Sequence, residues 1–204
     1  MKTSKASVMS SRALHIVRAG LDTADEIGLV HAVSWKAAYR DILPAPCLAG
    51  FTPEKRAEIF RRNLIRREKN DEEFYLFRFE EKAVGMAILG NAEEPDIPAA
   101  AGEIGAFYFL PDIWGTGLAQ EAMTYCLSRF QERGSTRVIL WVLAENRRAR
   151  RFYEKNGFLF DGGRHAFSPF PPSFPPRESK ETEETEEPEN VVLELRYSQE
   201  LTHR

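Results

Sequence analysis

The segment that most constrains the fold is a strand, a glycine turn and a long helix in direct succession. Residues 103–110 are expected to form a strand that Pro111 ends, and Gly115-Thr116-Gly117 follows. The next residues, up to Arg133, carry apolar side chains at offsets of 0, 3, 4, 7, 8 and 11, which predicts an amphipathic helix. Its inward side chains are Ala119, Ala122, Met123, Cys126, Leu127 and Phe130. Gly134 is expected to end this helix.

The glycine turn stands where the helix begins, and this position favours a bound anion. Unpaired N–H groups and the helix dipole give a helix N-terminus a partial positive charge. Glycines let backbone approach a phosphate or pyrophosphate closely, although a tight turn without a ligand explains the same residues. A dinucleotide-binding fold fits less well, because Gln120 stands at the third glycine position and the two preceding strands form a hairpin. A P-loop is excluded because no Gly-Lys-Ser/Thr follows.

The rest of the chain predicts strands and helices in a mixed α/β order. The segments 14–18, 73–79, 83–89, 137–143, 158–160 and 191–197 have the composition or alternation of strands. A first helix is expected from Asp22 or Thr23 to about Tyr39, and Pro44 and Pro46 end that region. A second helix begins at Thr52-Pro53. A short helix begins at Asn146 and ends at Asn156-Gly157.

Composition bounds the class of protein. With 204 residues the chain has room for one domain, which we place at residues 13–204 after a mobile tail at 1–12. Lys and Arg total 28 and Asp and Glu total 31, so the net charge of −3 gives no support for nucleic-acid binding. We find neither a membrane-spanning run nor a signal peptide. Cys47 and Cys126 lack metal-ligand spacing, so we expect no disulfide, no metal and a cytoplasmic protein.

One stretch, residues 161–190, differs from the rest in composition. It holds six of the twelve prolines, and residues 177–190 carry seven Glu against Arg177 and Lys180, a local charge of −5. The remaining residues therefore carry about +2. We interpret 161–190 as an insert, Pro- and Phe-rich at first and acidic afterwards. The acidic half is expected to be disordered because it has almost nothing to bury, and the aromatic half is either a lid or a tethered surface loop.

Three segments stand out by their order and spacing. They are residues 31–44, with Trp35 and Ala38-Tyr39, residues 103–120, with the glycine turn, and residues 140–158. Together they resemble the GNAT superfamily of acetyl-CoA-dependent N-acetyltransferases, over residues 16–160 and again over 191–201. The resemblance implies a twisted mixed sheet of six to seven strands with about four helices, splayed between the fourth and fifth strands. One departure is Trp114, where relatives commonly have Gln or Arg.

The resemblance also implies a site for acetyl-CoA in the splay. Splayed strands have unpaired backbone groups that need partners, and the two amides of the pantetheine arm would supply them. The implied cofactor-binding residues are Phe107, Tyr108 and Phe109 for pantetheine, Gly115, Thr116, Gly117, Leu118, Ala119 and Gln120 for the pyrophosphate, and Asn146 for pantetheine. A helix N-cap is an equally good interpretation of Asn146 and is compatible with the first.

Candidate catalytic residues follow from the same resemblance. Tyr153 matches the tyrosine beside the CoA sulfur, where a phenol could protonate the leaving thiolate, although a core aromatic is the alternative. Glu103 begins the fourth strand and is a candidate base, acting directly or through water, or a binder of the ammonium form. A solvated Glu at a strand end is equally plausible. Backbone N–H groups near Phe109 are candidate donors to the oxyanion.

The acceptor site is expected beside the first helix. Trp35 and Tyr39 share a face of that helix and are candidate substrate-binding residues, with core packing as the alternative. His31 is expected to be a polar residue at the edge of the same helix rather than a base. The four arginines at 147, 148, 150 and 151 are either a solvated helix face or contacts for the 3′-phosphate of CoA.

These observations favour an N-acetyltransferase that moves an acetyl group from acetyl-CoA to a primary amine by direct attack. The acceptor is either a small molecule or a peptide, and homodimers are frequent in the family. Two alternatives stay open at this point. One is a catalytically silent acyl-CoA-binding or sensor domain, and the other is a protein-interaction module built on the acidic insert.

Overall fold

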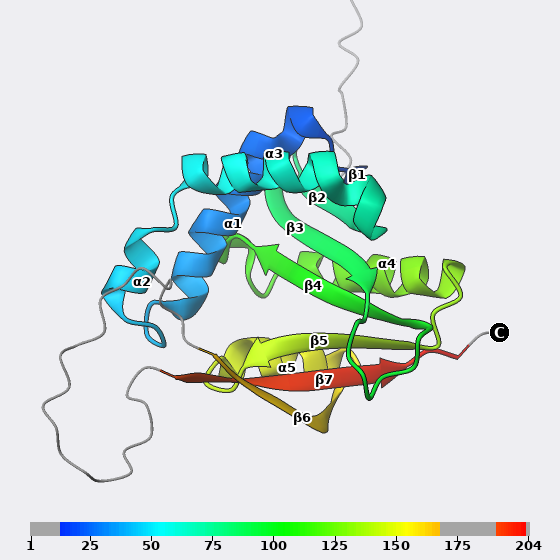
Figure 1. The fold of residues 1–204 in the computed structure, drawn as a ribbon. Helices are drawn as coiled ribbons and strands as arrows, with labels where there is room; N and C mark the ends of the chain where they lie inside the picture. Colours follow the sequence, from blue (N-terminus) through cyan, green and yellow to red (C-terminus); the bar gives the residue numbers. More distant parts are fainter. Residues whose placement is uncertain (1–12, 168–190, 203–204) are drawn as a thin grey trace, which may run out of the picture.

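A seven-stranded mixed sheet forms the centre of the structure (Figure 1). The computed structural model describes residues 13–167 and 191–202. In spatial order the strands are β1 (His15–Arg18), β2 (Glu73–Phe79), β3 (Lys82–Asn91), β4 (Ala101–Phe109), β5 (Arg137–Leu143), β7 (Val192–Glu200) and β6 (Leu159–Phe167). Neighbouring strands are antiparallel except for β4 and β5, which are parallel. The predicted mixed α/β sheet is therefore confirmed.

Helices cover both faces of this sheet. They are α1 (Ala24–Tyr39), α2 (Ala45–Ala49), α3 (Pro53–Asn70), α4 (Leu118–Glu132) and α5 (Arg147–Lys155), with 3-10 turns at Leu21–Thr23 and Pro111–Ile113. Helices α1 and α3 pack on one face, where Ile27 and Phe60 meet Leu76 of β2. On the other face, Met123 and Phe130 of α4 share a core with Phe77. Each face of the sheet thus has its own hydrophobic core. None of the helices in the described ranges is long and apolar enough to cross a membrane.

The helix predicted after the glycine turn is confirmed. Ala122, Met123, Cys126 and Phe130 are fully buried along one side of α4. Of the three predicted caps, Thr23 stands at the N-cap of α1, but its side chain makes no capping hydrogen bond. The cap at Thr52 is confirmed, because its side chain accepts a hydrogen bond from the Lys55 N–H at the start of α3. The cap at Asn146 is likewise confirmed, because its side chain accepts a hydrogen bond from the Ala149 N–H at the start of α5. Local capping and periodicity were sufficient to find these helices.

The structure corrects two predictions about the elements. The prolines at 44 and 46 do not simply end a helical region, because the short helix α2 begins there and brings the helices to five. Proline is tolerated in the first turn of a helix, where its missing N–H has no partner to lose. The strand expected at 158–160 continues to Phe167, so residues 161–167 belong to β6 rather than to the insert. The remainder of the expected insert, 168–190, and the expected tail, 1–12, lie outside the described residues.

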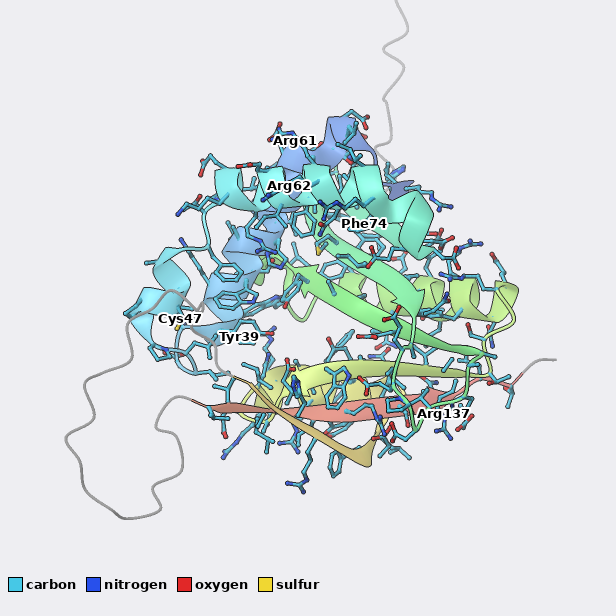
Figure 2. The ribbon with its side chains drawn as sticks, in the orientation of Figure 1. Tyr39, Cys47, Arg61, Arg62, Phe74 and Arg137 are labelled. Carbon is cyan, nitrogen blue, oxygen red and sulfur yellow. The ribbon has the colours of Figure 1, made fainter. Side chains whose placement is uncertain are left out.

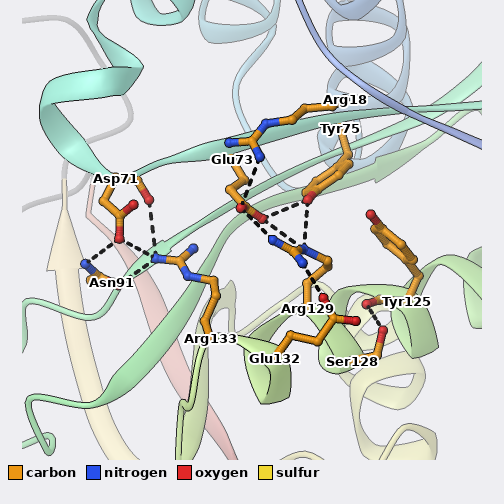
Figure 3. A network of polar contacts seen from close by, with 10 residues as sticks. All are labelled: Arg18, Asp71, Glu73, Tyr75, Asn91, Tyr125, Ser128, Arg129, Glu132 and Arg133. Atoms are coloured by element: carbon orange, nitrogen blue, oxygen red, sulfur yellow. Dashed lines mark hydrogen bonds and ion pairs between the residues drawn. The ribbon is translucent and has the colours of Figure 1, made fainter.

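A polar network fixes α4 against the sheet (Figure 3). The Glu73 carboxylate on β2 accepts hydrogen bonds from the Tyr75 hydroxyl at 2.7 Å and from Nη2 of Arg129 on α4 at 2.9 Å. Arg18 of β1 lies 3.4 Å away. Burial acts to raise the pKa of Glu73, but the hydrogen bonds from Arg129 and Tyr75 bring it below its usual value. This network helps to determine where the other end of α4, with the glycine turn, lies.

A second network ties the β3–β4 connection to the far end of the sheet. Arg196 of β7 is only 6% exposed, and its guanidinium binds two carboxylates. Asp96, in the β3–β4 connection, lies 2.5 and 2.7 Å from its two terminal nitrogens. Asp161 of β6 lies 3.0 Å from its Nε. A buried guanidinium requires such partners, so Arg196 fixes three segments that are distant in sequence.

Candidate active site

A cavity opens where β4 and β5 separate. The two strands pair only at Ala101–Glu103 with Arg137–Ile139. Beyond Glu103, β4 is paired with β3 alone, and the gap widens toward α1 and α2 (Figure 1). The resulting cavity of about 540 Å³ is lined by residues of α1, β4, the glycine turn, β5 and α5. This separation is the splay that the resemblance implies, and it leaves one edge of β4 without a neighbouring strand.

The glycine turn lies at one side of the cavity with open backbone. Gly115 and Gly117 have φ angles of +82° and +94°, and a Cβ at either position would meet nothing within 4 Å. Only glycine adopts this conformation freely. Among the described residues no acceptor is found for the N–H groups of Gly115, Gly117, Ala119 and Gln120, all of which line the cavity. These four donors at the start of α4 form an anion-binding arrangement.

Two residues of the turn have other partners. The Thr116 N–H donates to the Ile113 carbonyl at 3.3 Å, and its hydroxyl donates to the same oxygen at 2.7 Å. The Leu118 N–H donates to the Thr116 hydroxyl at 3.5 Å, and its side chain is buried in the core. Neither residue lines the cavity. Thr116 and Leu118 therefore close the turn, and their N–H groups are not available as the sequence prediction required.

Asn146 both caps a helix and faces the cavity. Its Oδ1 accepts a hydrogen bond from the Ala149 N–H at 3.1 Å, which confirms the predicted N-cap of α5. The side chain is buried and lines the cavity. The cap occupies the carbonyl oxygen, and the Asn146 side chain also hydrogen-bonds Tyr39. Of the two N–H donors of its amide nitrogen, one is therefore left for a ligand.

Three tyrosines from three elements meet at the cavity. Tyr39 at the end of α1, which Figure 2 shows next to Cys47 of α2, has its hydroxyl 3.4 Å from that of Tyr108 on β4. Tyr153 of α5 is 8% exposed, and no described residue hydrogen-bonds its hydroxyl. Burial and the nearby Tyr39 raise the pKa of Tyr153, so its phenol stays protonated. Burial also raises the pKa of Tyr39 and of Tyr108.

The segment of the chain that builds this site matches a known family. The model of the acetyltransferase (GNAT) family matches residues 32–158. The chain belongs to the GNAT family. Structural neighbours agree on the fold. The PaiA N-acetyltransferase from Thermoplasma acidophilum, solved in complex with coenzyme A, aligns over 93% of this chain and 99% of its own with a TM-score of 0.66 and 16% identity. The YncA protein from Salmonella typhimurium, solved with its cofactor acetyl-CoA, aligns over 94% and 96% with a TM-score of 0.61 and 11% identity.

Relatives in sequence carry the same family name. Uncharacterized N-acetyltransferases from Mycobacterium bovis and Mycobacterium tuberculosis are 37% identical to the chain over 87 residues. That match covers 43% of this chain, and the chain spans about half, 53%, of the length of these relatives.

Three residues that the sequence analysis discussed for catalysis or acceptor binding do not line the cavity. Glu103 lies on β4 where that strand is still paired with β5, and it does not line the cavity. Trp35 stacks on Phe51 at 3.5 Å between ring centroids and is likewise absent from the lining. His31 is not at an edge: it is 6% exposed, and its Nδ1 has no partner among the described residues. Burial, with Arg56 nearby, lowers the pKa of His31 to about 3, so it stays neutral.

The structure adds cavity residues that the sequence analysis passed over. Trp141 and Val142 of β5 both line the cavity, and Val142 also belongs to the buried core together with Leu140. Every residue of β5 after Arg137 is apolar, so no pattern along this strand separates its cavity residues from its core residues. Tyr108, expected to act through its backbone, also contributes its hydroxyl.

The four arginines of α5 lie in three different surroundings. Arg150 donates to the Ala144 carbonyl at 2.9 Å and to the Tyr197 hydroxyl at 3.0 Å, which is a structural role. Arg148 and Arg151 line the cavity, whereas Arg147 is exposed outside it. No group of three His, Cys, Asp or Glu side chains within the described ranges could hold a metal ion.

Proposed function

We propose that the protein transfers an acetyl group from acetyl-CoA to a primary amine by direct attack of the amine. The acceptor is a small molecule or a peptide. The membership of the GNAT family and the two structural neighbours solved with coenzyme A or acetyl-CoA support the choice of donor. When bound, acetyl-CoA supplies an acyl carbonyl activated by its sulfur leaving group.

The chain's own residues fit such a donor. The free edge of β4 from Phe107 to Phe109 offers backbone groups to the amides of a pantetheine arm, although the Phe109 carbonyl already accepts the Trp114 Nε1–H at 2.8 Å. The N–H groups of Gly115, Gly117, Ala119 and Gln120 face the same cavity and suit its pyrophosphate. Asn146, which follows both regions in the sequence, lines the same cavity, and its amide nitrogen suits pantetheine.

The observation that carries the proposal is the environment of Tyr153. Its phenol is buried, lines the cavity and has no described partner. Because its pKa is raised, the hydroxyl remains a hydrogen-bond donor at neutral pH and can stabilise the thiolate as it leaves. The Tyr39–Tyr108 pair lies at the α1 side of the cavity and is where we place the amine.

The Tyr153→Phe variant tests this role. We expect single-turnover acetylation to fall about 100-fold or more, because the donor to the thiolate is lost, while the Kd for CoA stays within about twofold. Tyr125→Phe is the matched control, since Tyr125 packs on Tyr75 outside the cavity. A wild-type rate in Tyr153→Phe would remove Tyr153 from the mechanism. A wild-type chain that binds CoA but acetylates no amine of a broad panel would favour the silent acyl-CoA-binding domain instead.

A further inference from the structure

An aromatic ring in the cavity wall carries an arginine on its face. Trp114 precedes the glycine turn, and its Nε1–H donates to the Phe109 carbonyl at 2.8 Å, which fixes the ring against the end of β4. Arg148, in the first turn of α5, lies with its guanidinium carbon 3.5 Å from the centroid of that ring. Trp is the aromatic side chain that attracts a cation most strongly in this geometry. The pair thus spans the cavity wall from the glycine turn to α5.

The Arg148 guanidinium is not committed to a carboxylate. Within residues 13–167 and 191–202 it makes no ion pair and no hydrogen bond, and its contact is the Trp114 ring. By contrast Arg129 holds Glu73, and Arg196 holds Asp96 and Asp161. A contact with the face of a ring uses none of the five N–H donors of a guanidinium, so Arg148 retains both its charge and its hydrogen-bonding capacity.

The position of Arg148 brings this charge to the open donors of the glycine turn. Arg148, Trp114, Gly115 and Gly117 all line the same cavity. The unpaired N–H groups of the turn favour an anion through the start of α4, and Arg148 adds a full positive charge from α5. Two elements distant in sequence therefore present anion-binding groups to one space.

We infer that Arg148 is a phosphate ligand of this chain, held ready on Trp114, that binds the diphosphate of a CoA thioester together with the glycine turn. The inference rests on the proposed function and goes beyond it, because it assigns the side chain that supplies the charge. Arginine suits the role because its planar donors match two phosphate oxygens at once. Binding exchanges part of the Trp114 contact for charge-assisted hydrogen bonds to phosphate.

The test measures binding rather than turnover. The Kd values of CoA and of S-acetylpantetheine, which has no phosphate, are determined by calorimetry for wild type, Arg148→Gln, Arg148→Lys and Arg147→Gln. Arg147 is the matched control because it is the neighbouring exposed arginine of α5 and does not line the cavity. We expect Arg148→Gln to weaken CoA binding roughly 10- to 100-fold, Arg148→Lys to recover part of it, and Arg147→Gln to change it less than about twofold.

The two ligands separate charge from packing. S-acetylpantetheine should bind wild type and Arg148→Gln equally. The inference is overturned if Arg148→Gln binds CoA like wild type, if Arg147→Gln loses as much, or if both ligands lose affinity equally in Arg148→Gln. A wild-type chain that binds no CoA contradicts the proposed function and this inference with it. Wild-type binding of CoA together with an unaffected Arg148→Gln contradicts the inference alone.

Discussion

At the scale of single residues, burial shifts the pKa values of the titratable groups. Tyr153 is enclosed by protein, and the loss of water raises the pKa of its phenol, so its hydroxyl stays protonated and can donate a hydrogen bond at neutral pH. Glu103 experiences the same penalty on a carboxyl, with the charges of Glu94 and Glu93 adding to it. A raised pKa brings a carboxylate closer to what a base at neutral pH needs. The same effect, burial, therefore favours the protonated form of both the phenol and the carboxyl group.

A base role for Glu103 predicts a specific pH profile. Because burial raises the pKa of Glu103, its base form is lost as pH falls through a value above the usual one for Glu. We expect wild-type kcat/KM to decline along an acid limb at that pKa. Glu103→Gln should lower kcat/KM about tenfold or more at neutral pH and remove the limb, as measured from pH 5 to 9. Since Glu103 does not line the cavity, it would act through a water.

The neighbouring Glu94 supplies the control for that profile. Its negative charge helps to raise the pKa of Glu103, so Glu94→Gln should move the acid limb to lower pH while the plateau rate is kept. An acid limb in Glu103→Gln identical to that of wild type would exclude Glu103 as the base.

At the scale of elements, a close helix contact determines where Tyr39 lies. Gly28 of α1 faces the first turn of α3, where a Cβ would come 2.5 Å from the Ala57 nitrogen and 2.7 Å from the Pro53 carbonyl oxygen. These are backbone atoms, which cannot rotate away. The absence of a side chain at Gly28 thus allows α1 and α3 to approach closely. Helix α1 then carries Tyr39 to the cavity.

The Gly28→Ala variant should therefore be destabilised. Alanine gains about 1 kcal/mol in helix propensity, but overpacking against backbone costs about 1–3 kcal/mol, so we expect a net loss of up to about 2 kcal/mol in urea unfolding. Gly50→Ala serves as the control, because a Cβ there meets nothing within 4 Å and its φ of −71° suits any residue. It should change the free energy of unfolding by less than about 0.5 kcal/mol. Equal stability of Gly28→Ala and wild type would show that the helices separate without cost.

The elements that sequence patterns predicted are those with strong local signals. Helix α4 carries an unbroken apolar stripe, and Asn146 and Thr52 supply capping groups. Helix α2 was missed because its prolines indicate a break as readily as a first turn. The end of β6 was missed because Gly162 and Gly163 interrupt its pattern, and its extent depends on pairing with β7.

At the scale of the whole molecule, the ends of β6 and β7 show what the intervening residues must span. Phe167 and Val192 are paired partners in the antiparallel ladder, so the two ends are already side by side. A connection between adjacent antiparallel strands needs only a few residues. The connection between Phe167 and Val192 is therefore longer than the pairing of β6 with β7 requires.

Deletion of residues 177–189 should for this reason leave the domain folded. We expect Tm to change by less than about 3 °C and the Kd for CoA by less than about twofold, because the pairing of β6 with β7 stays intact. Thermal unfolding and calorimetry measure both quantities, with the full chain as reference. Loss of soluble, folded protein would show that this segment contributes to the core.

The sequence by itself determined the local chemistry of this protein. The turn residues Gly115 and Gly117, the stripe of α4 and the cap at Asn146 depend only on neighbours a few positions away, so they follow from spacing alone. The likeness to the GNAT family rests on the same local segments, and the family match and the splayed sheet bear it out.

Only the tertiary structure decided which distant side chains meet. The register of β3 and β4 shifts at Ile88 and Leu89, which leaves Gly105 as an extra residue and changes the face on which later side chains lie. Tyr108 thereby meets Tyr39, 69 positions away, while Glu103 stays outside the cavity. Contacts of this kind depend on strand register and on the splay of the sheet, and neither is encoded in the spacing of nearby residues.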